Sequence, residues 1–318
     1  MSQLGSGHLF RSITIAKFLK KKFLLKYNDI IFVTKTKKKF SKTSKILKNY
    51  NFKIYRIDSN IKNYSTREAK ILNKFEGKLV IIDRLGKVNK KFINYGLKNF
   101  KKKIIIDDSS NYRNYFDISF NPLITNVKKF KNNFIGLKKF ISPIYFYKMR
   151  KIKTKNGVFI FFGNYDKKNI LKKVLLNKTY KQTIVFYLPE TYRSVAKAYN
   201  IKSKIYFFKM NKFYYYMQKS KFAILSGGMT LFDALYMNKK IICIPQYRHQ
   251  FDNLYSNKIE NNLILLKYGQ KNFKSELAKF FEKMILSKIK IKKCKLVERK
   301  NMSLTLKSIG EQFNGSKK

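Results

Sequence analysis

The first half of the chain alternates short hydrophobic runs with segments whose hydrophobic residues recur every three or four positions. The runs are rich in β-branched and aromatic residues, which is typical of strands buried in a parallel sheet. They lie at residues 29–36, 52–58, 78–83 and 102–108. Segments between them, such as 65–75 and 89–100, have the pattern of crossover helices.

A second series of hydrophobic runs follows a lysine-rich segment at residues 148–155. Its members are residues 157–163, 182–190, 204–209, 222–228, 240–246 and 263–269. Because strand and helix patterns alternate again, we expect two doubly wound, Rossmann-like α/β domains, residues 1–150 and residues 151–318. In such domains ligands bind beyond the carboxyl ends of the strands, so the loops at those ends are the places to look for a site.

The chain is strongly basic, with 72 Lys and Arg against 17 Asp and Glu and a formal net charge of +55. Such a charge is typical of proteins that bind nucleic acid or anionic membranes. Only nine of the basic residues are Arg, however, and Asn, Ile, Phe and Tyr are also abundant, as an AT-rich coding sequence would produce. Specific nucleic-acid readers favour the bidentate geometry of Arg. We therefore expect no specific nucleic-acid partner, although the charge allows weak contact with an anionic membrane surface.

The two cysteines, Cys243 and Cys294, lie far apart and lack the spacing of a metal site or a disulfide framework. Cys243 lies inside an apolar run, so we expect a buried structural thiol. No run reaches the roughly 18 apolar residues of a membrane-spanning helix, and no signal peptide is recognisable. The sequence therefore predicts a cytoplasmic protein without a metal site or a cofactor.

The glycine-rich sequence GSGH at residues 5–8 opens a segment with hydrophobic residues at helical spacing. Gly7 allows the backbone to approach a ligand closely, and the helix N-terminus directs N–H groups and positive dipole toward it. His8 and Arg11 fall in the first turns of this helix. The dipole disfavours an imidazolium, so His8 could act as a neutral base; the alternative is a histidine that only caps the helix.

A second loop of this kind directly follows the hydrophobic stretch 222–225 and opens another helix. It comprises Ser226, Gly227, Gly228, Met229 and Thr230. Backbone amides and hydroxyls in such a loop can hold a diphosphate, and Asp233, one turn later, could accept hydrogen bonds from ribose hydroxyls. The alternative is a tight turn with a solvated aspartate. The polar loop at 245–250, which contains His249 and Gln250, follows the next strand and lies at the same edge.

Three acidic residues of the first domain stand at the ends of predicted strands: Asp83, Asp107 and Asp108. A carboxylate at such a place can position a substrate or a histidine. It can equally cap the following helix or hold a turn, so both interpretations stay open.

With these residues assembled, the chain resembles the nucleotide-sugar hydrolases of pseudaminic acid biosynthesis, which release UDP from UDP-2,4-diacetamido-2,4,6-trideoxy-β-L-altropyranose. GSGHLFRSITIAKFL is similar to the family's GxGHxxRxxxLAxxL, and IIDDSSNYRNYFDISFNP to its IDDxxNRxxxxDxxxNQ. FIFFGNYDKKN is similar to FGGxDxxN, and FAILSGGMTLFDALYMNKKIICIP to aIsaGGxTxxExxxxGxPxxxi. These hydrolases are GT-B-fold relatives of the UDP-GlcNAc transferase that makes lipid II, so the resemblance implies a GT-B-like fold.

The resemblance also implies roles for individual residues, with the sugar nucleotide held between the two domains. His8 would activate the water that attacks the anomeric carbon, with Asp83 or Arg11 as its partner. UDP binding is assigned to Ser226, Gly227, Gly228, Met229, Thr230, Asp233 and Gln250, and further substrate contacts to Gly7, Asp108 and His249.

Four departures from the family pattern keep a second interpretation open. The family's Asp-x-Tyr is here Asp83-Arg84-Leu85, Asn164 replaces a glycine, and Asp233 replaces a glutamate. The family's Asn-Gln pair is here His249-Gln250. A GT-B glycosyltransferase that uses a UDP-sugar donor is therefore the alternative to a hydrolase. The family also carries a short strand before GxGH that this chain lacks, so we expect either a start codon upstream or a truncated first strand.

Overall fold

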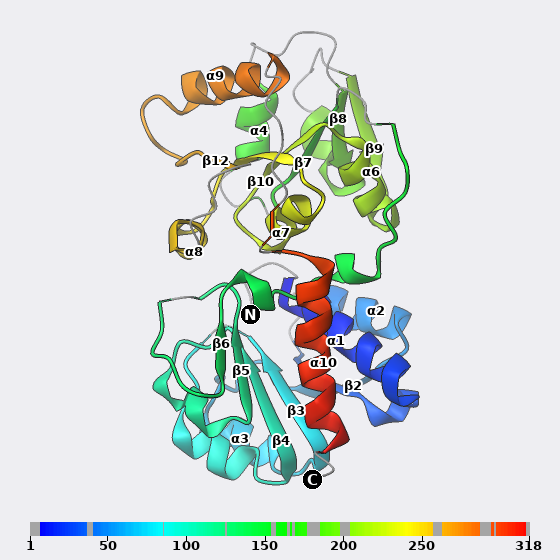
Figure 1. Ribbon diagram of the computed structural model, residues 1–318, viewed down its shortest axis with the longest axis vertical. Helices are drawn as coiled ribbons and strands as arrows, with labels where there is room; N and C mark the ends of the chain where they lie inside the picture. Colours follow the sequence, from blue (N-terminus) through cyan, green and yellow to red (C-terminus); the bar gives the residue numbers. More distant parts are fainter. Residues whose placement is uncertain are drawn as a thin grey trace. The chain divides into compact units, whose positions relative to one another are not determined.

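The computed structural model describes residues 7–36, 41–84, 86–124, 126–153, 157–163, 166, 169–176, 185–197, 204–256, 263–286, 294–295 and 297–315. The chain divides into two compact units (Figure 1). Unit 1 comprises Met1–Tyr145 and Arg299–Lys318, and unit 2 comprises Phe146–Glu298. The units differ from the ranges expected from the sequence in two respects. The break between them falls after residue 145 and not after residue 150. The C-terminal helix belongs to unit 1 and not to the second unit.

Unit 1 is built from parallel strands and the helices between them. Its described helices are α1 (Gly7–Phe23), α2 (Ser41–Asn49), α3 (Thr66–Leu72) and α10 (Arg299–Asn314). Its described strands are β1 (Ile31–Lys35), β2 (Lys53–Ile57), β3 (Gly77–Asp83), β4 (Phe100–Ile106), β5 (Ile118–Asn121) and β6 (Asn133–Ile135). In this part of the chain β1 pairs only with β2, while β3, β4, β5 and β6 form a second parallel sheet in that order. The residues before Gly7, where the family carries a short strand, lie outside the described ranges, so the expectation about that strand stays a prediction.

Helical segments pack on both faces of the larger sheet. Neighbouring residues of β4 point to opposite faces and therefore join different hydrophobic clusters. Ile104 and Ile106 join a hydrophobic cluster with residues of α1 and α10, which lie side by side in Figure 1. Ile105 joins a separate cluster with Ala69 of α3 and with residues of the segment 88–97, which follows β3. Helix α1 also contributes to a third cluster, with α2 and the β1–β2 sheet, through Ile13 and Ala16. Each fully buried isoleucine of these clusters stabilises the fold by roughly 1.5–3 kcal/mol.

The crossover helix expected at residues 89–100 is only a short π-helical segment, η3 (Phe92–Gly96). A Cβ atom at Gly96 would lie 2.9 Å from Cα of Ala69, so the segment approaches the backbone of α3 closely. By contrast, α3 lies within its expected range, and its N-cap residue is Ser65, whose Oγ accepts a hydrogen bond from the backbone N–H of Glu68.

Unit 2 contains one parallel sheet with the strand order β12-β11-β10-β7-β8-β9. Its strands are β7 (Gly157–Phe161), β8 (Val185–Pro189), β9 (Lys204–Phe208), β10 (Phe222–Leu225), β11 (Lys240–Cys243) and β12 (Leu263–Leu265). Its described helices are α4 (Ile170–Leu175), α5 (Arg193–Lys197), α6 (Phe213–Lys219), α7 (Met229–Tyr236), α8 (Arg248–Ser256) and α9 (Phe273–Leu286). This is the strand order of dinucleotide-binding folds, and it reverses between β7 and β10, where such folds bind their ligands.

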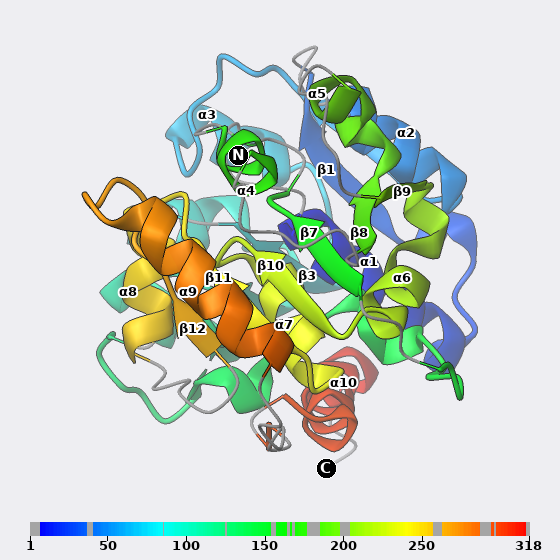
Figure 2. The same cartoon turned by 90° about the horizontal axis from the view of Figure 1, so that it is seen from above.

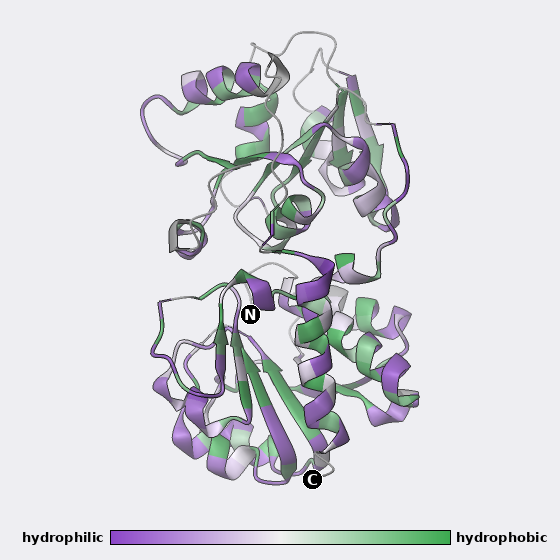
Figure 3. Cartoon of the chain, in the orientation of Figure 1, coloured by the Kyte–Doolittle hydropathy of each residue, from purple (hydrophilic) through white to green (hydrophobic). Residues whose placement is uncertain are grey.

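The centre of this sheet is fully buried, as the continuous hydrophobic runs predicted. Every residue of β7, β10 and β11 is buried, and Figure 3 shows these strands as mainly hydrophobic. Helix α9 packs on β11 (Figure 2), and Cys243 on that strand is the buried thiol expected from the sequence, with its pKa raised by burial. At the opposite end of β11, buried Lys239 donates hydrogen bonds from Nζ to the carbonyls of Gln218 (2.6 Å) and Ser220 (2.5 Å).

Candidate functional site

The polar side chains of unit 1 meet at one edge of the larger sheet. Asp83 is the last residue of β3 and pairs with Ile106, the last residue of β4. Asp107 follows directly, so both carboxylates stand at the carboxyl ends of adjacent parallel strands. His8 and Arg11 come to this edge from the first turns of α1, three residues apart and therefore on one face of the helix.

Arg11 is fully buried between the two carboxylates. Its Nε and Nη2 donate to Oδ2 (2.8 Å) and Oδ1 (2.5 Å) of Asp83, and its Nη1 donates to Oδ2 of Asp107 (2.7 Å). Burial alone would lower the pKa of Arg11, but Asp83 and Asp107 raise it above its ordinary value. The guanidinium is therefore a permanent positive charge that holds both carboxylates in place.

The carboxylate of Asp83 accepts two further hydrogen bonds, from the ring of His8 and from Oγ of Ser12 (3.2 Å). Burial would raise the pKa of Asp83, but the charge and hydrogen bonds of Arg11, and after them those of His8, hold it well below its ordinary value. Asp83 is therefore ionised at neutral pH, although its side chain is only 2% exposed.

His8 is oriented by this carboxylate. Its Nδ1 lies 2.7 Å from Oδ1 of Asp83 and 3.1 Å from Nη2 of Arg11. Because the carboxylate only accepts and the guanidinium only donates, the shorter contact assigns the proton to Nδ1, which donates it to Asp83. Nε2 then carries the lone pair. With 12% of the side chain exposed, His8 has the geometry of a general base positioned by an acid.

The other two acidic candidates of unit 1 hold loops. Asp107 has a left-handed backbone (φ 54°), and its Oδ1 accepts a hydrogen bond from the N–H of Leu123 (3.1 Å). Asp108 is fully buried and accepts from the N–H of Val88 (2.9 Å) and from the N–H and Oγ of Ser110 (2.7 and 2.5 Å). These contacts agree with the interpretation in which Asp108 holds a turn. Substrate binding by Asp108 stays a prediction.

In unit 2 the loop from Ser226 to Gly228 joins β10 to α7 at the reversal of strand order. The N–H of Ser226 donates to the carbonyl of Phe161 (3.3 Å), which ties the loop to the end of β7. Gly228 is the N-cap residue of α7, so Met229 and Thr230 form its first turn. The first N–H groups of a helix have no partners within it, and the dipole favours an anion there.

Gln250 lies against this loop. A Cβ atom at Gly227 would stand 2.9 Å from Cβ of Gln250 and 3.1 Å from Cδ1 of Leu254, so α8 approaches the loop as closely as glycine allows. Oε1 of Gln250 accepts a hydrogen bond from the N–H of Gln246 (2.8 Å). The structure therefore brings together the predicted residues Ser226, Gly227, Gly228 and Gln250.

Two further candidates of unit 2 have different surroundings. Asp233 lies one turn into α7 but is only 4% exposed, and its Oδ2 accepts a hydrogen bond from the hydroxyl of Tyr214 (3.2 Å). His249 is exposed, and its ring stacks on that of Tyr247 (centroids 5.5 Å apart, 13° between planes). Ribose binding by Asp233 and substrate binding by His249 stay predictions.

Four positions that the sequence singled out lie outside the described residues: Gly5, Ser6, Leu85 and Asn164. They belong to the GSGH loop, the position of the family's tyrosine and the FGN segment.

Sequence reasoning missed a second buried ion pair in unit 1. Arg84 forms two hydrogen bonds of 2.8 Å with the carboxylate of Glu68, and its guanidinium lies 4.0 Å from the ring centroid of Tyr64. The only signal for it was the position of Arg84 directly after a strand-end aspartate. This ion pair ties Arg84, the residue after Asp83, to Glu68 of α3. In the described part of the chain it does not contact His8.

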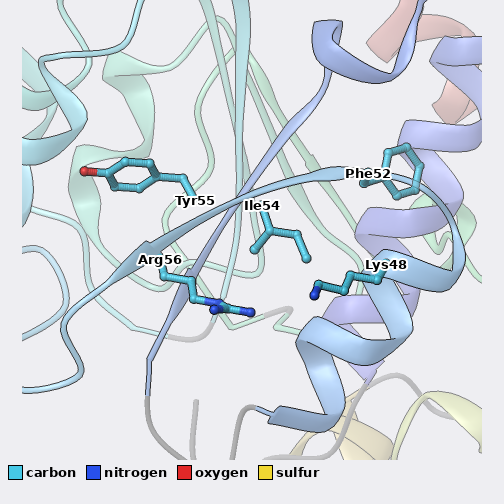
Figure 4. Close-up of a pocket in the computed structure, with 5 residues that line it drawn as sticks. All are labelled: Lys48, Phe52, Ile54, Tyr55 and Arg56. Carbon is cyan, nitrogen blue, oxygen red and sulfur yellow. The ribbon is translucent and has the colours of Figure 1, made fainter.

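A surface hollow of about 450 Å³ lies at α2 and β2, away from these residues. It is lined by Lys48, Phe52, Ile54, Tyr55 and Arg56, and in Figure 4 the ring of Tyr55 points away from Lys48 and Arg56. None of the candidate residues lines it. Among the described residues no three His, Cys, Asp or Glu side chains are grouped to hold a metal ion. None of the helices in the described ranges combines the length and apolar character needed to span a bilayer.

No family model matches the sequence. Uncharacterized protein MJ1062 of Methanocaldococcus jannaschii is 27% identical to it over 298 residues, which cover 84% of this chain and 59% of that protein. The chain thus spans less than two thirds of the length of this relative.

Solved structures match nearly the whole chain. MurG of Acinetobacter baumannii superposes with a TM-score of 0.59 at 11% identity, covering 98% of this chain and 97% of that one. The spinosyn forosaminyltransferase SpnP gives 0.59 at 9% identity, with 98% and 93% covered. MnaA of S. aureus, solved with UDP, gives 0.55 at 12% identity, with 95% and 92% covered. These matches confirm the fold expected from the sequence: the chain is an α/β protein of the GT-B fold.

Proposed function

We propose that the chain is a nucleotide-sugar hydrolase that releases UDP from a UDP-2,4-diacetamido-trideoxyhexose. The reaction would belong to cytoplasmic biosynthesis of pseudaminic-type nonulosonic acids. The observation that carries the hydrolytic chemistry is the 2.7 Å contact between Nδ1 of His8 and Oδ1 of Asp83, at the start of α1. The finer choice of sugar rests on the four sequence motifs.

In the proposed reaction Nε2 of His8 accepts a proton from water as the water oxygen forms a bond to the anomeric carbon. The bond from that carbon to the UDP oxygen breaks, and UDP leaves with the electron pair. Asp83 stabilises the imidazolium that forms, and Arg11 keeps Asp83 ionised and in place. The free sugar and UDP are the products.

UDP is assigned to the loop from Ser226 to Thr230 and to Gln250. Two observations support this assignment: the loop stands where the strand order of unit 2 reverses, and it opens α7. The helix N-terminus would stabilise the negative charge that develops on the departing diphosphate. The similar MnaA structure contains UDP, which agrees with this choice of nucleotide.

A glycosyltransferase with a UDP-sugar donor is the second candidate. The fold matches MurG and SpnP, and SpnP is a spinosyn forosaminyltransferase. The same base would then remove the proton of an acceptor hydroxyl.

The test follows UDP-2,4-diacetamido-2,4,6-trideoxy-altrose by NMR without an acceptor, with the wild-type protein and with His8→Gln. Release of free sugar and UDP by the wild type, reduced about 10²–10⁴-fold in the variant, is the expected result. Unfolding curves of both proteins show whether the variant is folded. A substrate that binds but stays intact until an acceptor hydroxyl is added would favour the transferase. Hydrolysis by His8→Gln at the wild-type rate would refute His8 as the base.

A further inference from the structure

The buried side chain of Gln246 crosses from the end of β11 to the end of β7, the strands on either side of β10. Gln246 follows β11, and its Nε2 donates a hydrogen bond to the carbonyl of Phe162 (2.6 Å), the residue after β7. In the sheet, β10 lies between β11 and β7. The amide therefore passes over the end of β10, where the loop from Ser226 begins.

The backbone of Gln246 makes a second connection. Its N–H donates to Oε1 of Gln250 (2.8 Å), whose Cβ packs against Gly227. One residue thus links the end of β7, the start of α8 and, through Gln250, the glycine of the phosphate loop.

The end of β7 is also held from its other side. The hydroxyl of Tyr192 accepts a hydrogen bond from the N–H of Phe162 (3.0 Å) and donates to the carbonyl of Gly163 (2.6 Å). Gly163 has φ +85°, a conformation that side chains rarely adopt. The amide of Gln246 and the hydroxyl of Tyr192 together fix both polar groups of Phe162, so the backbone leaves β7 in a defined direction.

We propose that Gln246 is a positioning residue for a nucleoside diphosphate: it sets the distance between the end of β7 and the Ser226–Gly228 loop without contacting the ligand. This inference rests on the proposed UDP site. Because Gln246 is only 3% exposed, its contribution to binding is indirect, through the loop and Gln250.

The same unit offers a matched control in Gln218, a glutamine that is also buried (8% exposed). Its Oε1 accepts hydrogen bonds from the hydroxyl of Tyr147 (3.1 Å) and the N–H of Arg150 (3.4 Å), and its Nε2 donates to the carbonyl of Arg150. Gln218 lies in the last turn of α6, shortly before β10 begins, so it lies at the edge of the sheet opposite the loop. Replacing Gln218 removes three side-chain hydrogen bonds, and replacing Gln246 removes the one from Nε2 to Phe162, so both variants leave polar groups without their side-chain partner.

The experiment is calorimetric titration of UDP into the full-length wild type, Gln246→Met and Gln218→Met, at a temperature where urea unfolding shows all three folded. We expect Gln246→Met to weaken UDP binding about tenfold and Gln218→Met to leave it within about twofold. Gln246→Asn, which keeps an amide but shortens its reach, should weaken binding like Gln246→Met and serves if the methionine variant fails to fold. Equal affinities of the Gln246 and Gln218 variants would overturn the inference alone. Absence of UDP binding to the wild type would overturn the proposed nucleotide site and this inference with it.

Discussion

Replacing Asp83 by asparagine separates the structural from the chemical role of the site in unit 1. The carboxylate accepts four hydrogen bonds, from His8, from Nε and Nη2 of Arg11 and from Ser12. Asparagine has nearly the same shape but offers one acceptor oxygen, and its NH₂ group would face donors. The variant therefore removes a charge and two acceptor positions without creating a cavity.

The expected loss of stability follows from the burial of this ion pair. Removing one partner of a buried pair typically costs about 3–5 kcal/mol. Arg11 would still have Asp107, through the 2.7 Å contact of Nη1, so we expect the lower end, about 3 kcal/mol. The rate should fall about 10²–10⁴-fold, because His8 would lose the acceptor that fixes its tautomer.

Urea unfolding measures the first quantity, and release of UDP from the sugar nucleotide by folded protein measures the second. Asp117→Asn is the control, because Asp117 is a partly exposed acid at the same sheet that pairs with Lys102 (2.9 Å) and is remote in sequence from the His8 contacts. Because Oδ2 of Asp117 also accepts a hydrogen bond from the backbone N–H of Lys103 (2.8 Å), Asp117→Asn should cost about 1–2 kcal/mol, less than Asp83→Asn, and leave the rate unchanged. An Asp83→Asn protein that hydrolyses substrate at the wild-type rate would refute the base assignment. Unchanged stability would refute the account of the buried ion pair.

Three further predictions concern packing and pH. Gly227→Ala should cost about 1–3 kcal/mol in urea unfolding, because its Cβ would stand 2.9 Å from Cβ of Gln250, whereas Gly228→Ala, with its nearest neighbour 3.8 Å away, should cost under about 1 kcal/mol. Because the pKa of Asp83 is lower in the folded than in the unfolded chain, its stabilisation is complete above about pH 4 and is lost as the pH falls further. The free energy of unfolding should therefore fall less steeply between about pH 5 and pH 2 for Asp83→Asn than for the wild type. Burial lowers the pKa of Lys239 to about 8 from 10.5, so the unfolded chain binds more protons between these values. Between about pH 8 and pH 10.5 the free energy of unfolding of the wild type should therefore rise with pH more steeply than that of Lys239→Met, by up to about 1.4 kcal/mol per pH unit. Equal slopes of the two proteins in this interval would contradict the prediction.

Local pattern predicted the strands of unit 2 well, for a physical reason. Strands covered on both faces need a hydrophobic residue at nearly every position, and each of the six predicted runs contains one strand of the sheet. In unit 1, β5 and β6 were not anticipated. They are short, and sequences such as ISFN carry little hydrophobic pattern. The prediction of a long helix at 89–100 was wrong. The segment packs closely against α3 at Gly96, and such a tertiary contact is not visible in the local sequence pattern.

The candidate site was predictable where chemistry follows from local position. Spacing places His8 and Arg11 on one helix face, whereas position alone left the role of Asp83 open, and the family resemblance named Asp83 or Arg11 as the partner of His8. That Arg11 is buried between two carboxylates did not follow, because the pairing of β3 with β4 decides it. The role of Gln246 depends on β10 lying between β7 and β11, which no local pattern records.

The placement of α10 has a consequence for how the protein is made. Leu306 and Ile309 are fully buried in the cluster that also contains Ile104 of β4, so the core of unit 1 includes residues that are synthesised after the whole of unit 2. The residues of unit 2 are all contiguous and leave the ribosome before α10 does. Unit 2 can therefore complete its core first, and the face of the larger sheet that packs on α1 and α10 stays partly uncovered until α10 emerges.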